Sequence, residues 1–169
     1  KIINEPFMER ATSFMSELKL RLGYGITGQQ DISDSYFPYM PLFTIGYPTA
    51  SYPFGDQYYY TIRPKGYDPN IKWEETTTWN AGIDFGFLNN RITGSLDYYY
   101  RETNDLISRI PVPAGSNLTN EIYTNIGSLR NEGIEFSISS KPIVTNKFIW
   151  DLGFNIAYNS NKITKLNKS

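Results

Sequence analysis

The stretch NAGIDFGFLNNRITGSLDYYYRET, residues 80–103, decides the fold class, because its apolar residues recur at every second position on both sides of Asn89-Asn90. Successive side chains of a β-strand point to opposite faces, so the pattern predicts two strands, each with one apolar and one polar face. Asn tolerates the left-handed backbone of a tight turn, which predicts a hairpin centred on Asn89-Asn90. Such a hairpin needs an apolar environment on one face only.

Three further segments repeat this alternation, among them ELKLRLGYGITG at residues 17–28 and FIWDLGFNIAYN at residues 148–159. We predict five strands at about 17–27, 73–88, 91–101, 131–140 and 148–159, joined in part by long loops at about 28–72 and 102–130. Phe7, Met8, Phe14 and Met15 have the spacing of one helical face, so a short helix or helical turn is expected before the first strand. Long and short connections between the predicted strands alternate along the chain, so the short turns fall at one end of the sheet and the long loops at the other.

The residue types exclude several function classes. No Cys or His occurs among the 169 residues, which removes thiolate nucleophiles, histidine general bases and the zinc sites that need either residue. The 16 Lys and Arg residues are scattered and the formal net charge is −1, so we expect no nucleic-acid partner. No apolar run reaches the roughly 18 residues that a membrane-spanning helix needs. We also expect no cofactor.

A soluble β-sandwich and a transmembrane β-barrel both contain sheets with one apolar face. The predicted strands reach the roughly 9–11 residues that cross a bilayer, which favours the barrel. Aromatic rings at the ends of the apolar faces match interfacial girdles, and the charged polar faces suit a wet or plugged lumen. The girdle residues are Trp79, Tyr98, Tyr100, Trp150 and Tyr158, and the charged positions are Lys19, Arg21, Asp84, Asp97 and Asp151.

The fold class that we predict is therefore all-β, an antiparallel transmembrane β-barrel segment. About five strands are fewer than the roughly eight that close the smallest such barrel. Open edges in lipid would leave backbone groups without hydrogen bonds at several kcal/mol each. We expect the chain to form part of a larger barrel.

Several blocks of the sequence closely resemble the C-terminal half of the SusC/RagA family of TonB-dependent outer-membrane transporters of Bacteroidota. These blocks are LKLRLGYGITGQQ, GYDPNIKWEETTTWNAGIDFGFLNNRITGSLDYYYRETNDLI, PVPAGS, NIGSLRNEGIEFSI and FNIAYNSNKITKL. The resemblance implies a plugged barrel of about 22 strands in the bacterial outer membrane. It also implies import of oligosaccharides or peptides with a SusD-like lipoprotein, driven by TonB. We expect the plug and the TonB contact to lie outside this segment.

The tyrosine-rich first loop suggests a substrate or partner contact, because tyrosine rings offer flat apolar faces with hydroxyl groups to a glycan. The candidate residues are Tyr36, Phe37, Tyr39, Tyr58, Tyr59 and Tyr60. The simpler interpretation, which we prefer, is that these rings pack the loop against itself, the barrel rim or the lid.

Other polar groups are weaker candidates. Glu74-Glu75 and the pair Asp84 and Asp97 offer carboxylates for glycoside hydrolysis, but neighbouring strand residues point to opposite faces, so we predict no enzyme. Asp31, Asp34, Asp56 and Asp68 lack the spacing of a calcium loop and suit turns, so no metal site is predicted. Arg130 is expected to pair with Glu132 or Glu135.

Three alternatives stay open at this point. A soluble carbohydrate-binding β-sandwich would fold without lipid. A non-transporting outer-membrane receptor or pore would show the same strands. A surface glycanase would need a carboxylate pair in a cleft.

Overall fold

The computed structural model describes residues 2–29, 38–45 and 51–166. Two compact units make up the chain. The first, here named the sheet unit, comprises Lys1–Thr27, Thr76–Thr103 and Leu129–Thr164. The second, the loop unit, comprises Gly28–Glu75, Asn104–Ser128 and Lys165–Ser169. Each unit is described by itself below.

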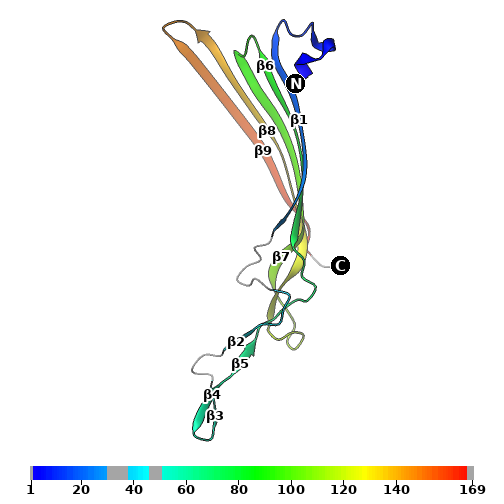
Figure 1. Ribbon diagram of the computed structural model, residues 1–169, viewed down its shortest axis with the longest axis vertical. Coiled ribbons are helices and arrows are strands. Elements are labelled where there is room, and N and C mark those ends of the chain that lie inside the picture. The colour runs from blue at the N-terminus through cyan, green and yellow to red at the C-terminus, as the bar shows by residue number, and fades with distance from the viewer. Residues whose placement is uncertain (1, 30–37, 46–50, 167–169) are drawn as a thin grey trace. The chain divides into compact units, whose positions relative to one another are not determined.

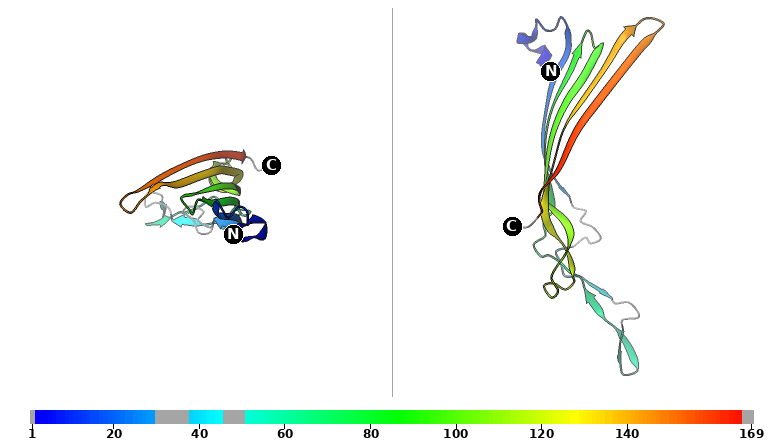
Figure 2. Two further views of the ribbon diagram at one scale, coloured as in Figure 1. Left: turned by 90° about the horizontal axis from the view of Figure 1, so that it is seen from above. Right: turned by 180° about the vertical axis from the view of Figure 1, so that it is seen from behind.

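Five long strands form one sheet in the order β1-β6-β7-β8-β9. Their bounds are β1 Met15–Gln29, β6 Glu74–Phe87, β7 Ile92–Pro111, β8 Glu121–Val144 and β9 Ile149–Lys165. Neighbours in the sheet are also neighbours in the order of these strands along the chain, and the strands lie side by side in Figure 1. The view from above in Figure 2 shows that the sheet is curved. The predicted five-stranded antiparallel sheet is confirmed, and β1 and β9 are its two edges.

The hairpin between β6 and β7 turns where the sequence predicts. Asn89 and Asn90 have φ angles of 56° and 61°, and the N–H of Arg91 donates to the carbonyl of Leu88 at 3.2 Å. Positive φ at both central residues is typical of the turn that matches the twist of paired strands, and Asn accepts it at low cost. Leu88 also has a positive φ of 52°, and its N–H donates to the carbonyl of Phe14 at 2.9 Å.

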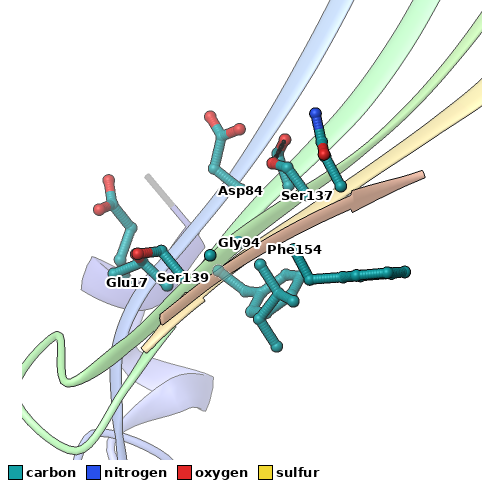
Figure 3. Close-up of a pocket in the computed structure, with 12 residues that line it drawn as sticks. Glu17, Asp84, Gly94, Ser137, Ser139 and Phe154 are labelled. Atoms are coloured by element: carbon teal, nitrogen blue, oxygen red, sulfur yellow. Dashed lines mark hydrogen bonds between the residues drawn. The ribbon is translucent and has the colours of Figure 1, made fainter. Parts of the chain in front are cut away.

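Each long strand of the sheet unit presents one apolar and one polar face. Glu17, Asp84, Ser137 and Ser139 project from one side of the strands in Figure 3, and Phe154 projects from the other. The hollow drawn there is lined from both faces of an open sheet, so it is not an enclosed site.

The apolar face of the sheet is uncovered. Phe154 is 59% exposed, and Ile3 is the sole buried apolar side chain in the described part of the chain. A sandwich needs a second sheet packed on the apolar face. No such layer exists among the described residues, so the five long strands form a single open sheet and no sandwich.

The start of the chain forms two short 3-10 helices, Ile2–Asn4 and Pro6–Met8, in line with the helical turn predicted there. None of the helices in residues 2–29, 38–45 and 51–166 is long and apolar enough to cross a membrane.

The first predicted loop contains short strands in the loop unit. β2 Phe43–Ile45 pairs with β5 Ile62–Pro64, and β3 Ser51–Phe54 pairs with β4 Gln57–Tyr60, all antiparallel. These two ribbons are visible in Figure 1. The sequence did not predict these short strands, because six prolines occur between residues 38 and 69 and proline within a run argues against a strand.

The second predicted loop, 102–130, is mostly strand. β7 continues to Pro111 and β8 begins at Glu121, so the prediction that this whole segment is a loop is wrong. Asp105 lies within β7 with a φ of 56°, a left-handed conformation that interrupts the regular alternation of side chains. Leu106 and Ile107 then follow as adjacent apolar residues, which hides the continuing strand from a pattern of period two.

Candidate functional site

A groove in the loop unit is the best-formed candidate for a binding site. Thr44 of β2 lies opposite Arg63 of β5, and the N–H of Lys65 donates to the carbonyl of Leu42 at 2.8 Å. Side chains alternate along each strand, so Leu42, Thr44, Arg63 and Lys65 share one face of this ribbon. That face forms one wall of a groove of about 750 Å³, which we name the basic groove.

The opposite wall comes from the ends of β7 and β8. Arg109 and Pro111 line it from β7, and residues 119–123 line it from β8 and the turn before it. The N–H of Val112 donates to the carbonyl of Asn120 at 2.9 Å, which holds the two chain segments together. Arg109 forms an ion pair with Glu121, so one cation of the groove already has a carboxylate partner.

Buried polar side chains fix the segment that leads out of the basic groove. Asp68 accepts hydrogen bonds from the hydroxyl of Thr124 and from the N–H of Asn70, the latter at 2.9 Å. The side chain of Asn125, which is 5% exposed, accepts from the N–H of Lys72 and donates to the carbonyls of Lys72 and Asp105. Asp68 therefore shapes a turn, which supports the structural role predicted for it.

The predicted contact tyrosines lie mainly on the β3–β4 ribbon. Tyr58 and Tyr60 share one face, and Tyr59 lies on the other face beside Tyr52, its partner across the strands. The side chains of Tyr58, Tyr59 and Tyr60 are all more than half exposed, as is Tyr39. The structure thus brings three of the six candidates together on one ribbon.

The two remaining candidates, Tyr36 and Phe37, lie outside the described residues. The prediction that the tyrosines contact a substrate or a partner stays a prediction. Tyr58 and Tyr60 are well exposed, whereas Tyr59 makes an edge-on contact with the ring of Phe54 at 6.3 Å between ring centres, so the packing interpretation also stays a prediction.

The polar face of the sheet unit carries a cluster of charges. The Arg21 guanidinium on β1 contacts Asp84 on β6 with Nη2 to Oδ1 at 2.8 Å and Nε to Oδ2 at 2.9 Å. The same Nη2 lies 2.7 Å from Oδ1 of Asp97 on β7, and Lys19 Nζ lies 3.8 Å from Asp84 Oδ2. Four of the five charges predicted for the lumen face are therefore paired with each other across three strands, and the fifth, Asp151 on β9, pairs with Lys141 on β8 at 3.9 Å.

The carboxylates that were considered for glycoside hydrolysis are engaged by other groups of the protein. Asp84 and Asp97 are both held by Arg21, and Glu74 accepts a hydrogen bond from the N–H of Ile107 at 2.8 Å. These contacts assign the carboxylates structural roles. No group of three or more acidic side chains suited to a metal ion occurs among the described residues.

The sequence predicts that Arg130 pairs with Glu132 or Glu135, and in the structure Arg130 on β8 pairs with Glu132. Its Nη2 lies 2.5 Å from Glu132 Oε2, and its guanidinium lies 4.9 Å from the centre of the Tyr100 ring. The hydroxyl of Tyr100 donates to Glu102 at 3.2 Å. The contact between Arg130 and the Tyr100 ring joins β8 to β7.

Sequence reasoning missed the basic groove. Arg63 and Lys65 stand in a proline-rich segment without strand periodicity, and their common face appears only when β2 pairs with β5. The alternation of Leu42 with Thr44 and of Arg63 with Lys65 was a usable signal, although each run is too short to stand out.

Comparison with known proteins adds family information. Residues 11–168 match the family model described as TonB dependent receptor-like, beta-barrel. The chain is 56% identical over 166 residues to the TonB-dependent receptor SusC of Bacteroides thetaiotaomicron, covering 98% of this chain and 16% of SusC. A TonB-dependent receptor of Formosa agariphila is 36% identical over 172 residues, covering 98% of this chain and 15% of that protein.

Solved structures agree with the sequence comparison. The RagAB peptide transporter superposes with a TM-score of 0.78 at 28% identity, over 98% of this chain and 17% of that chain. The chain therefore spans about a sixth of the length of the relatives that it matches.

Proposed function

Because the chain belongs to the TonB-dependent receptor β-barrel family, we propose that it forms part of an outer-membrane transporter that imports oligosaccharides with a SusD-like lipoprotein. The observation that carries this proposal is the open five-stranded sheet with one apolar and one polar face, matched along residues 11–168 to that family. An exposed apolar sheet face is stable in lipid, and both strand edges find partners in a larger barrel. The protein is located in the outer membrane.

The polar face supports a passage rather than a packed core. The two cations Lys19 and Arg21 balance the charge of Asp84 and Asp97 on this face, and small residues such as Ser95 and Ser137 lie beside them. A wall of paired charges and small polar groups tolerates water and a plug inside a barrel. TonB would act on the parent protein through parts outside this segment.

The exposed tyrosines of the β3–β4 ribbon support an oligosaccharide as the substrate. Aromatic rings stack on sugar faces, and their hydroxyl groups form hydrogen bonds with sugar hydroxyls. A peptide is the second candidate, because the superposed RagAB structure is that of a peptide transporter.

Uptake by the full-length protein tests this proposal. We expect cells that contain the receptor and its lipoprotein to take up a labelled oligosaccharide mixture, and an uncoupler of the proton gradient to abolish the uptake. Uptake that persists with the uncoupler would indicate a passive pore. Surface binding without uptake would indicate a non-transporting receptor, and cleavage of the sugars by the purified protein would indicate a glycanase.

A further inference from the structure

We propose that the basic groove binds an acidic oligosaccharide, with Arg63 and Lys65 pairing with carboxylate groups on its sugar rings. This inference rests on the proposed function, since it names the substrate class of the same transporter. It follows from the charges that line the groove and from their partners.

Among the residues that the structure describes, the cations of the basic groove outnumber its carboxylates. Arg63, Lys65 and Arg109 line the groove, and Glu121 is the one acidic side chain among its described lining residues. Arg109 is paired with Glu121, whereas neither Arg63 nor Lys65 has an ion-pair partner within the part of the chain that the structure describes. The groove therefore offers two cations to a bound anion.

The geometry of the ribbon presents these two cations together. Arg63 lies on β5 and Lys65 directly follows that strand, so the two cations are two positions apart along the chain, line the same groove and, in extended backbone, have Cα atoms roughly 6.6 Å apart. The β2–β5 pairing and the hydrogen bond from Lys65 N–H to Leu42 hold this arrangement. A guanidinium binds a carboxylate through two parallel hydrogen bonds, and an ammonium acts as a point charge beside it.

The rest of the lining fits sugar rings. Tyr67 and Tyr123 contribute aromatic surface, Asn120 contributes an amide, and Leu42 and Met40 contribute apolar area. A few polar groups set among aromatic and apolar surface are typical of small-ligand sites, and about 750 Å³ lies within their usual range. The segment after Tyr67 is fixed by Asp68 and Asn125, so this wall is formed before a ligand arrives.

The test measures binding to the full-length receptor in detergent. The probes are a hexamer of galacturonic acid, a neutral maltohexaose, and a hexapeptide of glutamate that has the charge of the acidic sugar. The double variant Arg63→Gln with Lys65→Gln removes both cations. The matched control is Arg91→Gln with Lys147→Gln, which removes two exposed cations from the turns of the sheet unit.

We expect the unsubstituted full-length receptor to bind the galacturonic acid hexamer at least tenfold more tightly than it binds maltohexaose. The double variant should lose at least tenfold of that affinity and most of its salt dependence, while the control keeps both. Arg63→Lys with Lys65 intact keeps the charge but loses the two parallel hydrogen bonds, so it should bind more tightly than the double variant and keep the salt dependence, which shows that the loss in the double variant comes from charge and not from misfolding.

Three binding results would overturn the inference: equal binding of the two sugars, an unchanged affinity in the double variant, or glutamate hexapeptide binding that matches the acidic sugar and falls equally in the variant. Failure of the proposed function is distinguishable from these results. Specific binding of the acidic sugar without energy-dependent uptake refutes transport and leaves the groove assignment standing, whereas uptake of neutral sugars alone refutes the assignment.

Discussion

Replacing Asn125 with alanine should release the segment around Lys72 from the ends of β7 and β8. The amide side chain of Asn125 makes three hydrogen bonds: it accepts from Lys72 N–H at 2.8 Å and donates to the carbonyls of Lys72 at 2.9 Å and Asp105 at 2.6 Å. Each such bond contributes about 1 kcal/mol net, so the variant should lose about 3 kcal/mol of local stability.

Amide hydrogen exchange measures this local free energy directly. A loss of about 3 kcal/mol corresponds to roughly a hundredfold faster exchange of the Lys72 amide. Exchange would be followed by mass spectrometry on peptides that cover residues 67–75 of the full-length receptor in detergent. Peptides from β9 should exchange at unchanged rates, because none of the three bonds involves that strand.

Asn120→Ala is the matched control for this experiment. Asn120 is exposed, and its side chain makes no hydrogen bond in the described part of the chain, so exchange at Lys72 should stay within about threefold of the parent. The reasoning is refuted if Asn125→Ala changes the Lys72 amide as little as the control does. It is also refuted if exchange rises equally along the whole sheet, since that result would mean global destabilisation.

Three further changes test other parts of the structure. Gly133→Ala places a Cβ 2.6 Å from the carbonyl oxygen of Tyr158 and from the hydroxyl of Tyr99, and such overpacking costs about 1–3 kcal/mol. The thermal midpoint of unfolding, measured by heat-modifiable electrophoresis, should therefore fall. The control Gly153→Ala has open space at its Cβ and should leave the midpoint unchanged. Arg21→Gln should also lower the midpoint, because Asp84 and Asp97 lose their shared partner. Arg21→Lys should lower it less, since an ammonium keeps the charge but cannot contact both carboxylates as the guanidinium does. Equal midpoints for the unsubstituted protein and both variants would contradict a stabilising role of this charge cluster. Tyr58→Ala with Tyr60→Ala should weaken oligosaccharide binding roughly three- to tenfold by calorimetry without altering the midpoint, and a lowered midpoint with unchanged binding would mean that the rings pack within the protein.

Features of the fold that depend on adjacent residues could be predicted from the sequence, whereas features that depend on residues far apart in the sequence could not. The hairpin at Asn89-Asn90 was predictable because alternation and turn preference are properties of a few adjacent residues. The continuation of β7 past Arg101 was not, because Asp105 changes the face on which later side chains appear. The hydrogen bond from Asn125 to the Asp105 carbonyl holds this irregular point, and its partner lies twenty residues away in the sequence.

The candidate sites divide in the same way. The polar face with Lys19, Arg21, Asp84 and Asp97 was predicted from alternation, although the pairing of one arginine with two aspartates required the register of three strands. The tyrosine run at residues 58–60 was visible in the sequence, but its division between two faces of a ribbon was not.

The sequence by itself determined that this chain forms amphipathic antiparallel strands, too few to close a barrel, with one face suited to lipid. These properties follow from a side-chain period of two, which each strand carries without reference to its neighbours. Only the tertiary structure decided that Arg63 and Lys65 line one groove and have no carboxylate partner within residues 2–29, 38–45 and 51–166, while Arg109 is paired with Glu121. The physical reason is that charge pairing depends on which distant segments meet and in which register, and local patterns do not encode that meeting.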